Sequence, residues 1–156
     1  MIRIHLFLIL LLLPLTMRSQ EDICIGKKHS LYSTVLQEER NYWIHLPDSY
    51  GRDTTQHYQV IYLLDGDAFF HSVVGISRTF TTVKGRHLPP SIIVGVLNVD
   101  RTRDLTPTAS AAGRDGKIAP GAVPQGGGSE PFSRFLTEEL RSVIDGTYRT
   151  NGKNML

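Results

Sequence analysis

Apolar and polar residues alternate in two short segments that begin about thirty residues into the chain. The segments are 30–36 and 41–46. Alternation with a period of two is typical of a strand that buries one face. The short polar stretch 37–40 suits a hairpin-like connection between them, and the glycine-containing segment 47–56 predicts a polar turn region. We therefore expect two neighbouring, half-buried strands.

Two later apolar runs, 60–64 and 92–99, are continuous rather than alternating. Continuous runs of this length are typical of strands buried on both faces, as in a parallel sheet covered by helices. Between them, Asp65-Gly66-Asp67 ends the first run, and apolar residues from Phe69 to Ile76 recur at helical spacing with Asp67 as the expected N-cap. A strand, a helix and a strand in this order predict a βαβ unit.

The segment 106–129 contains six glycines and three prolines and has no usable periodicity. It is predicted to be a long loop, and loops of this length are usually functional or disordered. Pro131 suits a first helical position. The helix after it should end near Gly146, with one apolar face made of Phe132, Phe135, Leu136, Leu140, Val143 and Ile144. Residues 154–156 resemble the first step into another strand.

The N-terminus is different in kind from the rest of the chain. Arg3 precedes an unbroken apolar run from Leu6 to Leu13, and residues 14–19 lead to a small residue. This is the pattern of a signal peptide, and we place cleavage near residues 19 and 20. The run is much shorter than the roughly 20 residues of a membrane-spanning helix, so no stable membrane anchor is expected. The protein is predicted to be exported, to the periplasm or outside the cell.

Composition and charge narrow the class of protein. The chain has 156 residues, 40% apolar and 21% charged, which fits one soluble globular domain, here residues 20–156. Removal of residues 1–19 takes Arg3 and Arg18 from the 17 basic residues and leaves 15 against 15 acidic ones. A neutral chain gives no reason to expect a nucleic-acid partner. Cys24 is the single cysteine, so no intramolecular disulfide can form, and we expect it to be buried.

The sequence contains no Gly-x-Ser-x-Gly motif, the turn that presents a nucleophilic serine in many hydrolases. Asp65-Gly66-Asp67 is the most chemically interesting short segment, because a turn directly after a buried strand can aim backbone N–H groups at an oxyanion. The alternative is a tight turn at Gly66 with Asp67 as a helix cap. A calcium loop does not fit, since the other ligand positions are missing.

Two further candidates are weak. Gly126-Gly127-Gly128-Ser129 precedes a helix and could hold an anion there, but it lacks the preceding strand and lysine of a phosphate loop, so a flexible connector is favoured. The histidines that follow the signal peptide are scattered without the paired spacing of metal ligands. We therefore expect no metal and no organic cofactor.

Several short segments occur in a characteristic order along the chain. They are Ile25-Gly26-x-x-His29-Ser30-Leu31, Glu38-Glu39-Arg40-Asn41-Tyr42, Leu46-Pro47-Asp48-Ser49-Tyr50, Tyr62-Leu63-Leu64-Asp65-Gly66-Asp67, the run Arg101 to Thr108, Gly126 to Gly128, and Tyr148-Arg149-Thr150. With this ordered set, residues 25–156 resemble the esterase family that includes esterase D and enterochelin esterase, within the α/β-hydrolase superfamily.

The resemblance implies that segments 30–36, 41–46, 60–64 and 92–99 are the first four strands of an α/β-hydrolase sheet. It also implies that the backbone amide of Asp67 is one oxyanion-hole donor. By analogy, Asp65 and Gly66, together with Arg103 and Asp104 in the loop 100–129, would line the acyl or alcohol pocket. The strand at 60–64 would lie beside the strand that begins near residue 154.

In this family a Gly-His-Ser-x-Gly-Gly elbow follows a segment like 154–156, and the acid and the histidine come later. None of these catalytic residues is in the sequence, so we expect an N-terminal half of the fold, truncated before the nucleophile elbow and inactive alone. The whole protein would be a carboxylic-ester hydrolase that acts on a small-molecule ester. The alternative is a non-catalytic exported binding module on a hydrolase scaffold.

Overall fold

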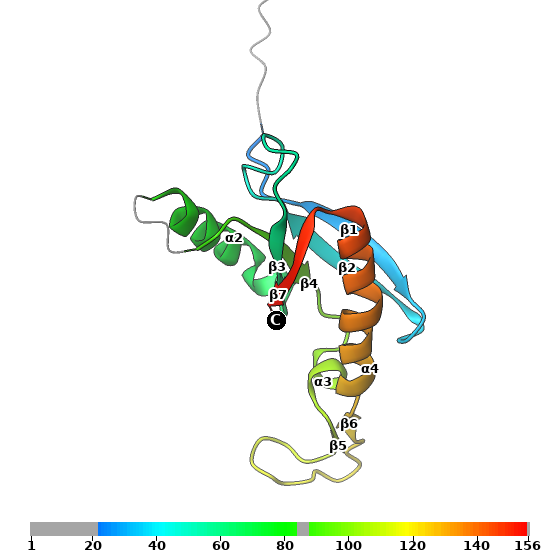
Figure 1. Cartoon of the computed structure of the whole chain (residues 1–156). Coiled ribbons are helices and arrows are strands. Elements are labelled where there is room, and N and C mark those ends of the chain that lie inside the picture. The colour runs from blue at the N-terminus through cyan, green and yellow to red at the C-terminus, as the bar shows by residue number, and fades with distance from the viewer. Residues whose placement is uncertain (1–21, 84–87, 156) are drawn as a thin grey trace, which may run out of the picture.

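The computed structural model describes residues 22–83 and 88–155, which form one mixed sheet with helices on both faces (Figure 1). The strand order is β1-β2-β4-β3-β7. In that order the strands are Lys27–Ser33, Glu38–His45, Ser91–Val96, Tyr58–Leu63 and Thr150–Met155. The predicted α/β-hydrolase sheet is confirmed, although each strand begins or ends a few residues away from its predicted position.

Strands β1 and β2 form the predicted hairpin, but the strand expected at 30–36 ends at Ser33. The reason is that the backbone leaves the ladder there. The N–H groups of Thr34 and Val35 donate to the Glu139 carboxylate, and Gln37 adopts a φ of 55° in the turn. Alternation continues beyond the strand because Leu36 still packs against the core.

The centre of the sheet is parallel, with β3 beside β4 on one side and β7 on the other. All six residues of β4 are buried, as a continuous apolar run predicts. In β3, burial alternates from Tyr58 to Leu63. Val60 pairs with Asn154, so the predicted neighbour of this strand is confirmed. The run expected at 92–99 ends at Val96, because Asn98 turns back toward the end of β3.

Helix α2 (Gly66–Thr82) covers one face of the sheet, where Phe70 and Val74 pack on Ile93. The predicted apolar face of this helix is wrong in part, since Phe69 and Ile76 are exposed. Its buried face is made of Gly66, Phe70, Val74 and Ser77.

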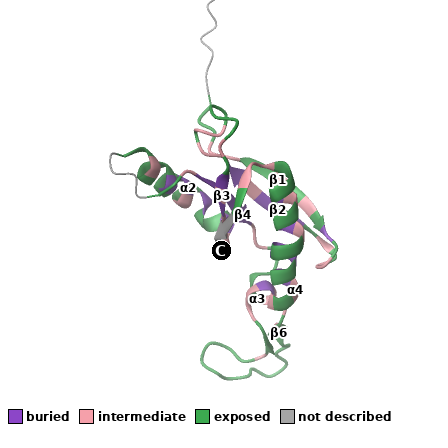
Figure 2. Cartoon of the chain, in the orientation of Figure 1, coloured by how far each residue is buried: buried purple, intermediate pink, exposed green. Residues whose placement is uncertain are grey.

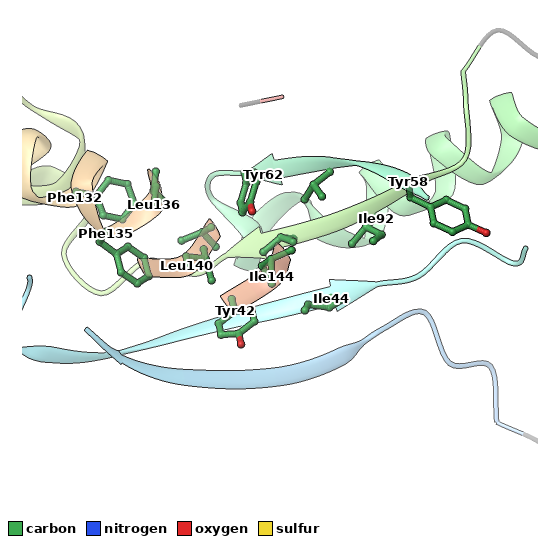
Figure 3. Packing of buried hydrophobic residues seen from close by; sticks show 13 residues of the cluster. Tyr42, Ile44, Tyr58, Tyr62, Ile92, Phe132, Phe135, Leu136, Leu140 and Ile144 are labelled. Atoms are coloured by element: carbon green, nitrogen blue, oxygen red, sulfur yellow. The ribbon is translucent and has the colours of Figure 1, made fainter. Parts of the chain in front are cut away.

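The other face is covered by a continuous helical rod, shown in Figure 1 around the label α4. It consists of α4 (Ser129–Arg134), the π-helical stretch η2 (Phe135–Leu140) and α5 (Arg141–Thr147). The predicted apolar face is confirmed, and its end is within one residue of Gly146. Figure 3 shows this face against the sheet, and its buried members are Phe132, Phe135, Leu136, Leu140 and Ile144. The helix begins at Ser129, two residues before the predicted start.

The long segment expected to be loop contains short regular elements. Helix α3 (Arg101–Leu105) begins it, and β5 (Ala109–Ser110) pairs with β6 (Gln125–Gly126). The paired residues close a protruding, mainly exposed hairpin (Figures 1 and 2). Composition alone could not reveal these elements, because each strand is only two residues long.

Two expectations concern the N-terminal region. The predicted signal peptide, residues 1–19, lies outside the described residues. Cys24 is exposed rather than buried, because it precedes β1 at the margin of the fold and donates only to the Gly26 carbonyl oxygen. In the part of the chain that the structure describes, no helix is long and apolar enough to cross a membrane.

Candidate active site

The candidate site lies where the parallel strands β3 and β4 end. Asp65, Gly66 and Asp67 lie just after β3, while Asn98 and Arg101 follow β4. The carboxyl ends of neighbouring parallel strands share one edge of a sheet, and ligands of open α/β sheets bind at that edge. The fold therefore brings these five residues together from two separate parts of the sequence.

Asp65 is the N-cap of α2, and its backbone is in the left-handed region, with φ 53° and ψ 41°. The prediction that Asp67 is the N-cap is wrong. The Asp65 carbonyl oxygen already accepts hydrogen bonds from the N–H groups of Ala68 and Phe69, at 3.0 and 3.1 Å, so the helix begins at Gly66.

The backbone N–H of Asp67 is free to serve a ligand. It lies in the first turn of α2, where N–H groups have no partner within the helix. Among the described residues, no acceptor is paired with it. The positive end of the helix dipole also lies here. A single N–H at the carboxyl edge of β3 is the geometry that the family resemblance assigns to the first oxyanion-hole donor.

Gly66 is required by a close contact between α2 and β4. A Cβ at this position would lie 2.6 Å from the carbonyl carbon of Gly95 and 2.9 Å from the backbone nitrogen of Val96. Both atoms belong to a buried strand and cannot move aside. The contact fixes the height of the first turn of α2 above the sheet.

The carboxylate of Asp65 is held by two side chains. Arg101 donates from Nε to Oδ1 at 2.8 Å and from Nη2 to Oδ2 at 3.0 Å. Asn98 donates from Nδ2 to Oδ1 of Asp65 and to Oδ1 of Asp67, both at 2.9 Å. The bonds from Arg101, and then those from Asn98, lower the pKa of the Asp65 carboxyl below its ordinary value.

Arg103 and Asp104, the other two predicted pocket residues, belong to a partly buried ionic cluster. Asp104 is 2% exposed and accepts from Arg40 Nη1 and Arg103 Nε, both at 2.8 Å. Glu38 accepts from both arginines, and its pKa is lowered chiefly by the bond from Arg103. The Arg40 guanidinium also packs on the Phe132 ring. The cluster joins β2 to α3 and to the helical rod.

The glycine-rich segment before α4 is a connector and not an anion site. The N–H of Gly127 donates to the Thr106 carbonyl oxygen, and that of Gly128 donates to the Arg103 carbonyl oxygen. Since these N–H groups are already occupied, they cannot hold an anion. Gly126 and Gly127 adopt positive φ values that let the chain turn there.

Two cavities lie at the opposite edge of the sheet, where β2 ends. Their volumes are about 240 and 350 Å³, and His45, Asp48 and Arg78 line both. None of the predicted site residues is among the residues that line them. The pocket-lining roles of Asp65, Gly66, Arg103 and Asp104 stay predictions. In the described ranges, no group of His, Cys, Asp and Glu side chains is arranged to hold a metal ion.

Sequence reasoning missed Asn98 and Arg101. Arg101 enters only as part of the family resemblance, and Asn98 falls inside a predicted strand. A usable signal is present: both residues follow the second continuous apolar run, as Asp65 follows the first. Polar residues that follow adjacent parallel strands are expected to meet.

Residues 33–156 match the family described as Putative esterase. The chain belongs to this esterase family. Among solved structures, the IroE-like serine hydrolase from Shewanella oneidensis is 33% identical to this chain, with a TM-score of 0.76. The match covers 83% of this chain and 40% of the hydrolase chain. The BES protein from Bacillus cereus is 27% identical with a TM-score of 0.67, covering 88% and 54%. No curated protein matches the chain.

The enterobactin esterase from Shigella flexneri, solved in the presence of enterobactin, is 18% identical with a TM-score of 0.57 and coverage of 84% and 28%. Likeness at this identity shows the shared fold. The esterase chain described here thus spans 40% and 54% of the lengths of its two more similar relatives. Family membership and the α/β-hydrolase fold therefore stand on both sequence and structure.

Proposed function

We propose that the whole protein is an exported serine esterase that hydrolyses small-molecule carboxylic esters, and that this chain supplies its first oxyanion-hole donor. The observation that carries the proposal is the unpaired N–H of Asp67 at the carboxyl edge of β3, within the described residues. Family membership supports the reaction class, and the apolar run before residue 19 supports export.

The chemistry follows from charge development on the substrate. When a nucleophile attacks an ester, the carbonyl oxygen becomes an oxyanion, and a fixed N–H donor stabilises that charge without reorganisation. The Asp67 N–H is fixed by the Gly66 contact and by the turn at Asp65. The dipole of α2 adds a favourable field at the same point.

Residues 1–156 contain no Gly-x-Ser-x-Gly motif, and a serine esterase also needs a base and an acid that orients it. The proposal therefore assigns the nucleophile, the base and the second oxyanion donor to the remainder of the whole protein. The substrate class, small-molecule carboxylic esters, is inferred from membership of the esterase family. The sequence of residues 1–156 contains no Gly-x-Ser-x-Gly nucleophile motif from which a substrate could be inferred directly.

The direct test compares the whole protein with the chain of residues 1–156. A fluorophosphonate probe should label the whole protein at a serine in a Gly-x-Ser-x-Gly motif, and p-nitrophenyl acetate should be hydrolysed. The 156-residue chain should show neither reaction. Labelling of any serine among residues 22–155 would overturn the assignment, and a whole protein that binds esters without hydrolysis would favour the non-catalytic module.

A substitution in the whole protein tests the donor itself. Asp67→Pro removes the N–H, and proline is tolerated in a first helical turn. Loss of one oxyanion donor lowers kcat by about 10²–10³-fold, and we expect that loss here with KM little changed. Asp67→Ala is the matched control, since it keeps the N–H. Equal kcat values for the two variants would contradict the proposal.

A further inference from the structure

Asp65 occupies a backbone conformation that its residue type disfavours. It and Gln37 are the two non-glycine residues with positive φ in the described ranges. Glycine adopts this conformation at no steric cost, whereas a residue with a Cβ is strained there. Strained residues persist where the surroundings over-determine them. The neighbours of Asp65 are therefore the place to look for what holds this turn.

Two side chains from the segment after β4 hold the Asp65 carboxylate. Arg101 binds both oxygens, and the Asn98 amide nitrogen bridges Asp65 to Asp67 with two bonds of 2.9 Å. The bridge spans the peptide between Gly66 and Asp67, whose nitrogen is the proposed donor. Two-point recognition of a carboxylate by a guanidinium adds geometric specificity as well as energy.

The side chain of Arg101 is 62% exposed, so the surrounding side chains cannot hold it in place, and its position must be set by its backbone. It is the first residue of α3, which Asp100 caps by accepting from the Arg103 N–H at 2.9 Å. The buried Asp104 on the same helix is joined to Arg40 of β2. Thus β2 anchors α3 through the Arg40–Asp104 pair, and α3 in turn positions the Arg101 side chain that binds the carboxylate of Asp65.

We propose that Asn98 and Arg101 are positioning residues that hold Asp65 in its left-handed conformation and so aim the Asp67 N–H. The inference rests on the proposed function for the use of that N–H, but the geometry is independent of it. Arg101 acts through Asp65, and Asn98 acts through the carboxylates of both Asp65 and Asp67.

The first experiment follows the Asp67 amide by NMR in the 156-residue chain. Arg101→Gln and Asn98→Ala should each shift the ¹H–¹⁵N resonance of Asp67. Arg78→Gln is the matched control, because it breaks another exposed pair of α2, with Asp48 at 3.2 Å, and should leave the Asp67 resonance in place. An unmoved Asp67 resonance in both the Arg101→Gln and the Asn98→Ala variant would overturn the proposal.

Rescue separates positioning from simple stabilisation. Asp65→Gly in the Arg101→Gln background should return the Asp67 resonance toward its wild-type position, since glycine keeps the left-handed turn without the two side-chain contacts. Failure of the folded double variant to do so contradicts the proposal. Where Arg101→Gln does not fold, Arg101→Lys keeps the charge but loses the two-point contact, and should give a smaller shift in the same direction.

Kinetics in the whole protein distinguish the two proposals. Arg101→Gln should lower kcat with little change in KM, and Asp65→Gly should restore part of the loss. Absence of esterase activity in the whole protein would contradict the proposed function but would not affect the conclusion from the NMR experiment. Full kcat in Arg101→Gln, in an enzyme that does hydrolyse esters, would end the positioning role alone.

Discussion

The close approach of Gly66 to Gly95 predicts how single substitutions at glycines of α2 change the stability of the fold. Gly66→Ala forces a Cβ against buried backbone, so the free energy of unfolding should fall by about 1–3 kcal/mol or more. At Gly75 of the same helix a Cβ would meet nothing within 4 Å, and Gly75→Ala should raise stability by about 0.5–1 kcal/mol. Urea unfolding measures both. Equal changes in the free energy of unfolding for Gly66→Ala and Gly75→Ala would contradict a steric role for the contact between Gly66 and Gly95.

His45 provides a pH-dependent prediction. The residue is 6% exposed, and its Nδ1 donates to the Ile25 carbonyl oxygen at 2.7 Å. Burial is the main cause of its lowered pKa. Between that lowered pKa and the ordinary value of 6.5, the unfolded chain binds more protons than the folded one. The free energy of unfolding should therefore fall as pH drops through this window, with a slope of at most about 1.4 kcal/mol per pH unit.

The measurement is urea unfolding at a series of pH values. His45→Gln should remove this contribution to the slope below pH 6.5. His57→Gln is the control, because His57 is exposed and lies in the turn region before β3, where its ring contacts the Thr55 carbonyl oxygen. If both variants keep the wild-type slope, the buried neutral state of His45 is wrong.

At the scale of elements, the ionic cluster holds α3 to the sheet. Asp104→Asn leaves Arg40, which is 1% exposed, with Glu38 as its remaining carboxylate, so we expect a loss of about 3 kcal/mol in stability. Hydrogen exchange in α3 should rise more than in β4. The control Glu138→Gln breaks an exposed pair with Arg134, where about 0.3–0.5 kcal/mol is expected. A cost for Asp104→Asn as small as the control's would contradict the role.

The sequence predicted the elements that carry a strong apolar signal. The rod from Ser129 to Thr147 was found from a helical period that runs over many residues, and the strands β3 and β4 were found as continuous apolar runs. Helix α3 and the β5–β6 pair were missed, since tertiary contacts define elements of two to five residues. The N-cap was misplaced because the left-handed turn at Asp65 is decided by Asn98 and Arg101, which are distant in sequence.

At the scale of the whole molecule, β7 forms one edge of the described sheet. It pairs with β3, and no other described strand lies beyond it. Exposed edges are templates for pairing with another chain. We expect the 156-residue chain to self-associate as its concentration rises, measured by sedimentation velocity. Backbone pairing should persist at high salt, whereas association driven by surface charge should weaken there. A monomer at all concentrations would contradict the prediction.

The pairing of β7 with β3 also determines the order in which strands can pair while the chain is being synthesised. The first four strands form a hairpin and a βαβ unit from neighbouring segments, whereas Tyr58 must wait for Thr150 to be synthesised. At ~5–20 residues per second, that interval is on the order of ten seconds. During it, one edge of the strand that contains Val60 has no partner within its own chain, and a chaperone that binds extended apolar segments would find it there.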